Sequence, residues 1–421
     1  MDKLIIEGGT VLDGAVDISG AKNAVLPILC AALLTDEACL ISNVPDLKDV
    51  HLMLKILRVL GAQTEFKNGM VRIRAKDIKS HIAPYSLVSR MRASFGILGP
   101  LLARINKAKV SLPGGCIIGV RPVDLHIKGL RRLGVDIEIS NGYVYGRSKR
   151  LRGASVYLGG EFGSSVLATA NVLMAAARAR GETIIEGAAC EPEVADLVVF
   201  LNKMGARIRG AGTPTLKIEG VERFNGVEHN IIPDRIEAGT FILAGAITGG
   251  GIVIRKAIPA HLSALIDKLE AVGVAIKKDG DCLRVRPKSR LKPVNITTLP
   301  YPGFPTDMQA QFMSLLTVIP GVSVVAEKIY PDRFMHIAEL NRMGARIQKE
   351  GPYAVVEGVK FLCGAPVMAS DLRASAALVL AGLASRGKTE ITRIYHLDRG
   401  YERLDKKLER LGAKIIRKRE C

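Results

Sequence analysis

The chain has 421 residues, a length that suggests two or three domains and allows a large core. Apolar residues make up 48% and charged residues 24%, and no tract is of low complexity, which excludes disordered and fibrous proteins. The longest apolar run, residues 241–254, is interrupted by glycines and is too short to span a bilayer. Seven widely spaced cysteines and an N-terminus without an apolar signal segment predict a reduced, cytoplasmic protein.

The net charge is unusual. Lys and Arg total 60 against 41 Asp and Glu, which gives +19. This excess favours anionic partners, which include nucleic acid, a membrane surface and small phosphorylated molecules. Tryptophan is absent and aromatic residues make up 5%, which argues against a single-strand nucleic-acid binder built on aromatic stacking.

In chain order, the predicted elements begin with an apolar strand at 3–8 and continue as a unit of roughly 70 residues that occurs six times. Each unit contains Leu, three residues and Gly, followed by a small and an apolar residue. Apolar residues at helical spacing precede the glycine, which fits a left-handed helix C-cap, and strand-like alternation follows it. The six glycines are Gly61, Gly134, Gly205, Gly273, Gly344 and Gly412.

Hairpin signals follow the first five glycines, at 67–69, 140–142, 211–214, 278–280 and 349–352. Two further strands and a long helix of small apolar residues, such as 375–385, complete a βαβαββ unit. The sixth unit ends at Cys421 without its last strand, and residues 3–8 resemble the equivalent strands at 215–220 and 354–358. We therefore expect the first ~20 residues to pair with the last repeat.

Six units divide into three and three, which predicts an α/β protein of two similar domains with a cleft between them. The first domain comprises residues 22–232, and the second combines 1–21 with 233–421.

The repeat brings a strand-to-helix junction into register six times, at 19–23, 88–92, 161–165, 233–235, 305–307 and 371–373. A helix N-terminus carries unpaired N–H groups and a partial positive charge, so several of them facing one cleft would bind an anion. The simpler role of Ser, Asp and Asn at single junctions is N-capping. Lys22, Arg92 and Arg373 oppose the helix dipole and therefore require an anionic ligand or a carboxylate nearby.

The sequence patterns do not support three other kinds of site. Residues 382–389 match the phosphate-loop pattern, but a predicted helix precedes the match and a strand follows it, the reverse of the required order. The histidines and cysteines lack metal-ligand spacing, and no Gly-x-Gly-x-x-Gly follows a strand. Neither a metal nor a dinucleotide cofactor is predicted.

The most informative loop spans residues 111–126, where Pro113 and Pro122 bracket three glycines and Cys116. A thiol near arginines such as Arg121 has a lowered pKa and can act as an acid or a nucleophile. The alternative is a buried structural cysteine, which a glycine-flanked loop disfavours. The remaining cysteines lie in apolar or terminal contexts and are predicted to be structural: Cys30, Cys39, Cys190, Cys282, Cys363 and Cys421.

Two further clusters carry charge. Residues 304–311 place Asp307 at a predicted helix start, where a cap is the simpler role. Residues 395–403 include Asp398 and Arg399, and the simpler interpretation is a solvated ion-pair cluster. The basic runs 147–152 and 417–419 are predicted to be solvated surface.

These stretches together resemble one known family, the MurA-type enolpyruvyl transferases, or UDP-N-acetylglucosamine 1-carboxyvinyltransferases. The similar motifs follow the family order over nearly the whole chain: SGAKNA at 19–24, MRAS at 91–94, LPGGC at 112–116, RPVDLH at 121–126, FPTDMQAQ at 304–311, RFMH at 333–336, DLRAS at 371–375 and DRGYER at 398–403. The resemblance implies an inside-out α/β barrel fold of two three-repeat domains, with the active site in the inter-domain cleft.

The resemblance implies transfer of the enolpyruvyl group of phosphoenolpyruvate to the 3′-hydroxyl of UDP-N-acetylglucosamine, with release of phosphate. This reaction is the first committed step of peptidoglycan synthesis, and it needs small-molecule substrates but no cofactor, nucleic acid or membrane. Cys116 would donate a proton to the enol carbon and carry a phosphoenolpyruvate adduct, and Asp307 would be the base at the sugar hydroxyl. Lys22, Arg121 and Arg399 would hold the phosphate and carboxylate of phosphoenolpyruvate.

The same resemblance implies a larger set of contacts to the UDP-sugar or the reacting groups: Asn23, Arg92, Arg121, Pro122, Val123, Asp124, Leu125, Ser165, Val166, Asp307 and Ile329. Asp371 and Arg373 would support the closed site. Such an addition–elimination needs an acid, a base and cations for about three negative charges, which these residue types supply.

The sequence departs from the family pattern at the third helix start, which lacks the usual Lys and has Leu167 in place of Gly. Cys190 also replaces the usual Arg ahead of Glu191. A divergent member or a second paralogue with altered nucleotide-sugar affinity therefore stays open. The rival enzyme is the sibling that uses shikimate 3-phosphate, which has no loop cysteine acid. A nucleic-acid-associated protein would instead need a continuous basic face.

Overall fold

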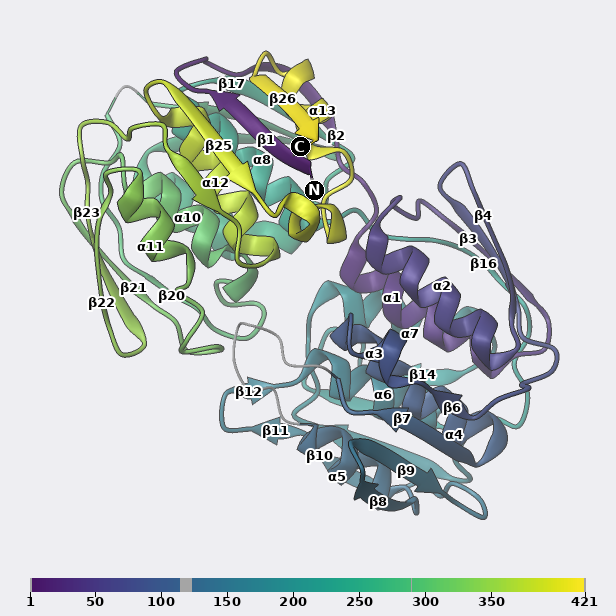
Figure 1. The fold of residues 1–421 in the computed structure, drawn as a ribbon. Helices are drawn as coiled ribbons and strands as arrows, with labels where there is room; N and C mark the ends of the chain where they lie inside the picture. Colours follow the sequence, from purple (N-terminus) through teal and green to yellow (C-terminus); the bar gives the residue numbers. More distant parts are fainter. Residues whose placement is uncertain (1, 114–122, 289, 420–421) are drawn as a thin grey trace. The chain divides into compact units, whose positions relative to one another are not determined.

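The computed structural model describes residues 2–113, 123–288 and 290–419, which form two compact units (Figure 1). Unit 1 combines the N-terminal residues up to Ser19 with the chain from Pro233 onward. Unit 2 runs from Gly20 to Ile232. Each unit has its own apolar core.

Six four-stranded sheets share one topology, in which the first two strands are parallel and each later strand is antiparallel to its neighbour. The sheets of unit 2 are β16 (Glu228–Asn230), β3 (Ala38–Ser42), β5 (Met70–Arg74) and β4 (Gln63–Lys67); β6 (Ile82–Ala83), β7 (Lys107–Ser111), β9 (Tyr143–Arg147) and β8 (Asp136–Ser140); and β10 (Ser155–Tyr157), β13 (Glu182–Glu186), β15 (Thr215–Glu219) and β14 (Arg207–Arg209). A short additional ladder pairs β11 (Gly159–Gly160) with β12 (Gly163–Ser164).

Unit 1 repeats this arrangement three times. Its sheets are β2 (Asp13–Asp17), β17 (Gly251–Arg255), β19 (Cys282–Pro287) and β18 (Val274–Asp279); β20 (Ile296–Thr297), β21 (Val322–Ala326), β23 (Tyr353–Glu357) and β22 (Arg346–Glu350); and β24 (Pro366–Met368), β25 (Lys388–Thr392), β1 (Asp2–Glu7) and β26 (Lys414–Arg419). The predicted α/β class, with three βαβαββ repeats in each of two similar domains, is confirmed.

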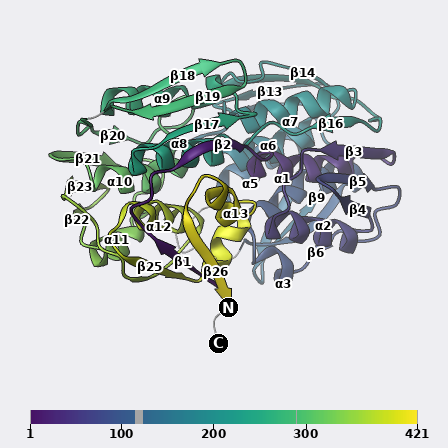
Figure 2. The same ribbon diagram turned by 90° about the horizontal axis from the view of Figure 1, so that it is seen from above.

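Each repeat places one helix inside its unit. In unit 1 these helices are α8 (Arg235–Thr248), α10 (Gln309–Leu316) and α12 (Leu372–Ala384), which contact one another and are buried along most of their length. A helix that is apolar on all sides is stable only in a core. The sheets therefore lie outside the helices, as Figure 2 shows for this unit. The equivalent helices of unit 2 are α1 (Lys22–Ala31), α4 (Leu98–Ile105) and α6 (Val166–Ala176).

The second helix of each repeat keeps one face exposed and contacts the last strand of a sheet. These helices are α2 (Lys48–Leu60), α5 (Asp124–Arg132), α7 (Pro192–Lys203), α9 (Ser263–Val272), α11 (His336–Arg342) and α13 (Leu404–Arg410). The short helical segments are α3 (Tyr85–Val88), η1 (Ala32–Leu34), η2 (Arg92–Ile97), η3 (Pro259–Leu262), η4 (Thr306–Met308) and η5 (Ile394–Arg399). The six repeat glycines follow the second helices with φ between 88° and 110°, a region that favours glycine, so the predicted C-caps are confirmed.

The N-terminal strand completes the last sheet. β1 lies between β25 and β26 and takes the place that β15 and β23 hold in their own sheets, as the sequence predicted. The next strand corrects the expectation that the first ~20 residues all pair with the last repeat. β2 instead runs parallel to β17 in the sheet of the fourth repeat. Only Val16 of β2 is buried, so its sequence carries no pattern that could select a partner.

Two crossover segments, which we define as residues 19–21 and 231–234, lie side by side. The Asp234 N–H donates to the Ser19 carbonyl at 2.8 Å, and the Ala21 N–H donates to the Ile232 carbonyl at 2.7 Å. The Ser19 N–H also donates to the buried carboxylate of Glu237 at 2.7 Å, and Lys407 pairs with Glu237 at 2.7 Å. The first segment is therefore anchored in the core of unit 1.

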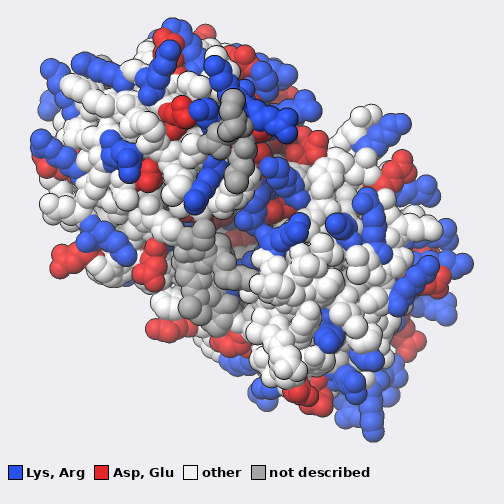
Figure 3. Space-filling model, in the orientation of Figure 1, with Lys and Arg blue, Asp and Glu red and all other residues white. Residues whose placement is uncertain are grey.

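The charged surface has two notable features. On the face shown in Figure 3, Lys and Arg are spread over both units and mixed with Asp and Glu. Arg417 corrects the expectation of a solvated basic run at 417–419, because it is half-buried and pairs with Asp398 at 2.7 Å, Asp405 at 3.3 Å and Asp2 at 3.5 Å.

No helix among the described residues is both long and apolar enough to cross a membrane.

Candidate active site

The Asp307 carboxylate lies in η4, just before α10, and pairs with two arginines. Its Oδ1 lies 2.8 Å from Arg333 Nη1, and its Oδ2 lies 2.8 Å from Arg373 Nη2. Burial favours the neutral acid, but the guanidinium groups of Arg373 and Arg333 outweigh it and hold the pKa of Asp307 well below its usual range. Asp307 is therefore a carboxylate that links two buried cations, rather than a helix cap.

Arg373 reaches Asp307 from the first turn of α12. Asp371 caps this helix by accepting the N–H groups of Arg373 and Ala374 at 2.8 and 3.1 Å. A side-chain cap fixes the backbone of the first turn and with it the direction of the Arg373 side chain. Arg373 Nη1 also lies 3.4 Å from the hydroxyl of Tyr401.

The Tyr401 hydroxyl joins the three inner helices of unit 1. It lies 2.8 Å from Thr240 Oγ1 on α8 and accepts a hydrogen bond from Gln311 Nε2 on α10 at 3.2 Å. Tyr401 is 2% exposed, and burial raises its pKa although Arg373 opposes the shift. A neutral phenol therefore connects the starts of α8, α10 and α12.

A second buried acid, Glu327, organises the loop that carries Arg333. Its Oε1 accepts hydrogen bonds from Thr298 Oγ1 at 2.7 Å and from the N–H groups of Ile329 and Tyr330 at 2.9 and 3.0 Å. Its Oε2 accepts the Thr306 hydroxyl at 2.9 Å, next to Asp307. Glu327 has no exposed surface. Its hydrogen bonds therefore hold the Ile329 backbone and the start of η4 in place together.

In unit 2, Lys22 begins α1 and Asp49 lies in the first turn of α2. Lys22 Nζ lies 2.8 Å from Asp49 Oδ2, and the side chains are 14% and 3% exposed. The carboxylate that the sequence required near Lys22 is therefore present. Asn23 follows on the same turn and is half-buried.

Arg92 begins η2 and lies near the buried His126 of α5. Burial, with a smaller contribution from the positive charge of Arg92, lowers the pKa of His126 to about 3. The ring packs edge-on against Phe95, and its Nδ1 lies 2.9 Å from Asn171 Nδ2. His126 is thus a neutral ring that joins η2, α5 and α6.

The comparisons with known proteins cover the whole chain. A family model described as EPSP synthase (3-phosphoshikimate 1-carboxyvinyltransferase) matches residues 6–408. The chain is 54% identical to the UDP-N-acetylglucosamine 1-carboxyvinyltransferase of Methylacidiphilum infernorum, with 99% of both chains covered. It is 53% identical to the enzyme of that name from Myxococcus xanthus, with 100% of both chains covered. The chain belongs to the UDP-N-acetylglucosamine 1-carboxyvinyltransferase family.

Solved structures agree with this family assignment. The enolpyruvyl transferase NikO from Streptomyces tendae has a TM-score of 0.90 at 27% identity, over 100% of this chain and 99% of that one. EPSP synthase from Acinetobacter baumannii has a TM-score of 0.74 at 19% identity, with 100% of both chains covered, and shares the fold. The two-domain enolpyruvyl transferase fold is therefore shown.

The structure brings several of the family residues together. Asp307, Asp371 and Arg373 form one cluster with Arg333, and Ile329 is tied to that cluster through Glu327. Arg399 ends η5 and is half-buried, at the C-terminal side of the same unit. Cys116, Arg121 and Pro122 lie outside the described residues, so their roles stay predictions.

The remaining family residues of unit 2 lie at two helix starts. Ser165 caps α6 by accepting the Ala168 N–H at 3.3 Å, and Val166 begins that helix. Val123 precedes α5, where Asp124 is exposed and Leu125 is half-buried. This cap is the simpler role that the sequence offered for such a serine.

The cysteines outside the 111–126 loop need one correction. Cys30 and Cys39 are buried, and burial raises the pKa of Cys39 to about 11. Cys363 is exposed, and Cys190 and Cys282 are half-buried, so the expectation of apolar surroundings is wrong for Cys363. Cys190, which replaces the usual family Arg, has a raised pKa because of partial burial and the nearby Glu191.

The sequence did not assign roles to Asp49, Arg333, Glu327 and Tyr401. Arg333 and Tyr401 lie within two of the family motifs, so a closer reading of those motifs could have found them. Asp49 is the only acid in the first turn of α2. Glu327 follows a predicted strand without a motif of its own, and only the fold reveals its partners.

Proposed function

We propose that this chain transfers the enolpyruvyl group of phosphoenolpyruvate to the 3′-hydroxyl of UDP-N-acetylglucosamine and releases phosphate, the first committed step of peptidoglycan synthesis. The observation that carries this proposal is the identity of 52–54% over essentially the full length of relatives that bear the enzyme's name. The cluster of half-buried Asp307 with the buried Arg373 and Arg333 provides the kind of charged residues that the reaction needs.

The proposed reaction is an addition followed by an elimination. A proton is added to the methylene carbon of phosphoenolpyruvate while the sugar hydroxyl attacks the adjacent carbon, which gives a tetrahedral intermediate. Loss of a proton from the new methyl group and departure of phosphate then restore the double bond. The first step needs an acid at carbon and a base at oxygen.

Asp307 is the proposed base at the sugar hydroxyl. A carboxylate held by two guanidinium groups is a weak base, because its pKa lies well below the usual range. We therefore expect proton transfer to accompany formation of the carbon–oxygen bond, since the hydroxyl becomes more acidic as that bond forms. Arg373 and Arg333 hold the carboxylate in place before the substrates bind.

Lys22, Arg121 and Arg399 are the proposed ligands of the phosphate and carboxylate of phosphoenolpyruvate. Asp49 supports this role because it fixes the Lys22 ammonium at 2.8 Å near the α1 N-terminus. Preoriented cations stabilise charge that develops on the leaving phosphate. Asn23, Arg92, Asp124, Ser165 and the neighbouring residues are the proposed contacts of the UDP-sugar.

An acceptor assay tests this function. With phosphoenolpyruvate present, we expect phosphate release only when UDP-N-acetylglucosamine is added. Shikimate 3-phosphate serves as the matched second acceptor, because the family model is described by that activity. No release with the UDP-sugar, from protein shown to be folded by circular dichroism, would overturn the proposal, and release with shikimate 3-phosphate alone would establish the sibling activity.

Cys116 is the proposed proton donor and adduct site. We expect the epoxide fosfomycin, which alkylates the loop thiol of this family, to inactivate the enzyme irreversibly and to add one label at Cys116. In Cys116→Ser, mass spectrometry should show no adduct, whereas Cys363→Ser, which removes an exposed thiol, should be labelled like the wild type. Unchanged labelling of Cys116→Ser would move the role to another cysteine.

The cellular setting follows from the same proposal. We place the enzyme in the cytoplasm, with two small-molecule substrates and no nucleic-acid or membrane partner. The widely spaced cysteines support this location. Leu167 and Cys190, where the chain departs from the family pattern, are the positions at which a paralogue would differ in UDP-sugar affinity.

A further inference from the structure

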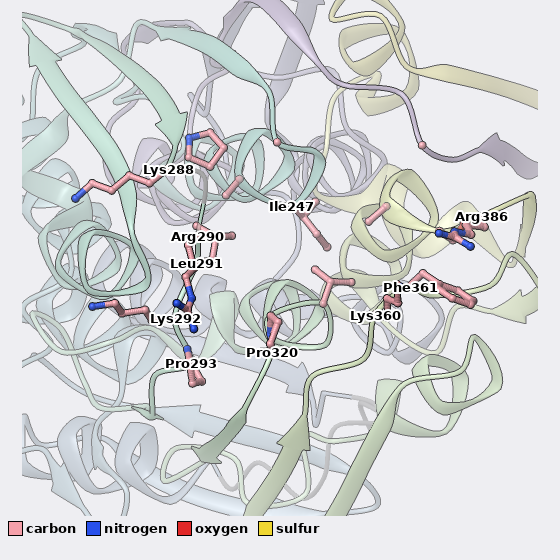
Figure 4. A pocket seen from close by; sticks show the side chains of 17 residues that line it. Ile247, Lys288, Arg290, Leu291, Lys292, Pro293, Pro320, Lys360, Phe361 and Arg386 are labelled. Carbon is pink, nitrogen blue, oxygen red and sulfur yellow. The ribbon is translucent and has the colours of Figure 1, made fainter.

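A large open pocket lies in unit 1, at the opposite ends of α8, α10 and α12 from Asp307 and Arg373. Its volume is about 1280 Å³. Ile247 near the end of α8, Val318 after α10 and Ala384 at the end of α12 contribute to its lining. Figure 4 shows the hollow between a wall carrying Arg290 and Leu291 and an opposite side carrying Lys360 and Phe361.

The pocket is strongly basic. Five of its lining residues are Lys or Arg, and none of the described lining residues is acidic. They come from all three repeats of the unit: Lys288, Arg290 and Lys292 after β19, Lys360 after β23 and Arg386 before β25. Figure 4 shows the Lys288 and Lys292 side chains pointing away from the hollow, so each must rotate about its side-chain bonds to reach a ligand there.

Cations near helix C-termini often serve only to complement the negative end of the helix dipole. Unit 2 shows this structural use at the equivalent ends of its inner helices. Arg104 donates to the Leu34 carbonyl at 3.1 Å, and Arg178 donates to the Glu222 carbonyl at 2.9 Å. These arginines therefore take part in the backbone hydrogen bonding of their own unit.

The helix ends of unit 1 are satisfied in another way. Thr248 Oγ1 donates to the Ala244 carbonyl at 2.8 Å, Thr317 Oγ1 to Ser314 at 2.7 Å and Ser385 Oγ to Gly382 at 2.9 Å. In the described part of the unit, none of the five cationic side chains of the pocket donates to a helix carbonyl or pairs with a carboxylate. Their positive charge is thus available to an external anion.

The repeat register shows one sequence difference between the units at the pocket. Gly181 and Gly387 occupy equivalent positions before β13 and β25, both with positive φ. Counting back three residues from each glycine places Ala384 where unit 2 has Arg178. A methyl group at this position of the pocket lining leaves space that a side chain as long as Arg178 would occupy.

The pocket also offers an aromatic and apolar surface. The Arg386 guanidinium lies 4.0 Å from the centre of the Phe361 ring, a stacked arrangement that orients its N–H groups. Phe361 is 40% exposed, and Ile247, Leu291 and Val318 line the same pocket. A phosphate-only ligand would use the cations but leave this surface in water.

We propose that this pocket binds a nucleoside polyphosphate, with the phosphates among the five cations and the base against the apolar lining. Arg and Lys are the preferred ligands of phosphate oxygens, and a volume above the roughly 300–1000 Å³ of ordinary small-molecule sites accommodates a nucleotide with its hydration. The site uses none of the residues assigned to enolpyruvyl transfer, so it is independent of that function.

Calorimetric titration with ATP tests the proposal. The enzyme is first saturated with UDP-N-acetylglucosamine, which prevents ATP from occupying the UDP-sugar site. We expect one ATP to bind, tripolyphosphate to bind more weakly and adenosine not to bind. Tripolyphosphate binding as tightly as ATP would overturn the assignment of a base to the apolar lining, and no binding of ATP would overturn the site.

Two double variants locate the binding. Arg290→Gln with Lys360→Gln should weaken ATP binding at least about tenfold, because a charge-assisted hydrogen bond contributes roughly that factor. Lys278→Gln with Lys418→Gln removes the same charge from exposed positions of unit 1 outside the pocket and should leave the affinity nearly unchanged. Equal losses in both pairs would show that binding depends on overall charge, which would overturn the pocket.

Discussion

We expect the Asp307 carboxylate to stabilise the fold as well as to act as the proposed base. Two buried guanidinium groups pair with this carboxylate. Removal of the carboxylate charge would leave both guanidinium groups without this partner. A group whose folded pKa is depressed stabilises the fold above its unfolded pKa, about 3.9 for Asp, and loses that contribution as pH falls through the folded pKa. Its contribution to stability is therefore complete at pH 5 and above.

We expect Asp307→Asn to abolish turnover and to lower the free energy of unfolding by about 3 kcal/mol. Urea denaturation at pH 5 and pH 7 should give the same loss, because Asp307 is ionised at both values. Glu357→Gln provides the control, since its exposed pair with Arg346 contributes about 1 kcal/mol or less. A loss at Asp307 no larger than the loss at Glu357 would show that the cluster does not stabilise the fold.

Glu327 is a positioning residue, because it acts through the backbone of Ile329 and the hydroxyl of Thr306. Glu327→Gln keeps the shape but replaces one acceptor oxygen with a donor, which breaks the hydrogen bonds on that side. We expect kcat/KM to fall roughly tenfold, with a higher KM for the UDP-sugar and an unchanged KM for phosphoenolpyruvate.

Steady-state kinetics with each substrate varied in turn measure the KM for the UDP-sugar and the KM for phosphoenolpyruvate separately. Glu350→Gln, at an exposed position at the end of β22, removes the same charge without a buried network and should leave both constants nearly unchanged. Equal increases in both KM values for Glu327→Gln would contradict a role directed at Ile329.

The same residues show how far the sequence could predict the site. Arg373 and Lys22 were predictable because the repeat register places them at helix starts, where a cation requires an anionic partner. The role of Asp307 was predicted from the family resemblance. The partners themselves were not predictable in this way. Arg333 lies 26 residues from Asp307, and Glu327 reaches Thr298 and Thr306 only because strands and loops bring them together.

Helices and strands were also predictable where they depend on adjacent residues, and less so where they depend on residues far apart in the sequence. Helix ends and hairpins were predictable because glycine C-caps and Asn-Gly turns depend on adjacent residues, and Asn68–Gly69 and Asn141–Gly142 do adopt positive φ. The partner of β1 was predictable because its pattern repeats that of β15 and β23. The partner of β2 was not, since strand pairing across more than 230 residues leaves no local signal.

The insertion of β1 into the last sheet gives a test at this scale. Leu4 is fully buried on the inner face of β1, between β25 and β26. We expect Leu4→Ala to lower the free energy of unfolding by about 2–5 kcal/mol, because it leaves a cavity in the core of unit 1. Urea denaturation measures this loss.

Val355→Ala on β23 is the matched control. Val355 is 41% exposed on a strand that holds the same place in its own sheet, so its truncation should cost no more than about 0.5 kcal/mol. If both variants lost the same stability, β1 would not be an integral strand of the sheet.

At the scale of the whole molecule, the two crossover segments link the units, and Asn43 contacts both. The Asn43 side chain donates to the Ile231 carbonyl at 2.8 Å, and a Cβ on Gly20 would lie 1.8 Å from the Asn43 carbonyl oxygen. A side chain at residue 20 must therefore displace Asn43 and, with it, the second crossover. Because the crossovers precede α1 and α8, the displacement also reaches the helix that begins with Lys22.

We expect Gly20→Ala to cost about 1–3 kcal/mol in stability and to lower kcat, because added volume in a close-packed segment shifts the backbone. Differential scanning calorimetry and the acceptor assay measure the two effects. Gly251→Ala in β17 is the matched control, since its Cβ would meet no atom within 4 Å and its φ is not positive. A Gly20→Ala enzyme with the melting temperature and kcat of the Gly251→Ala enzyme would show that the crossovers tolerate displacement and do not couple the fold to turnover.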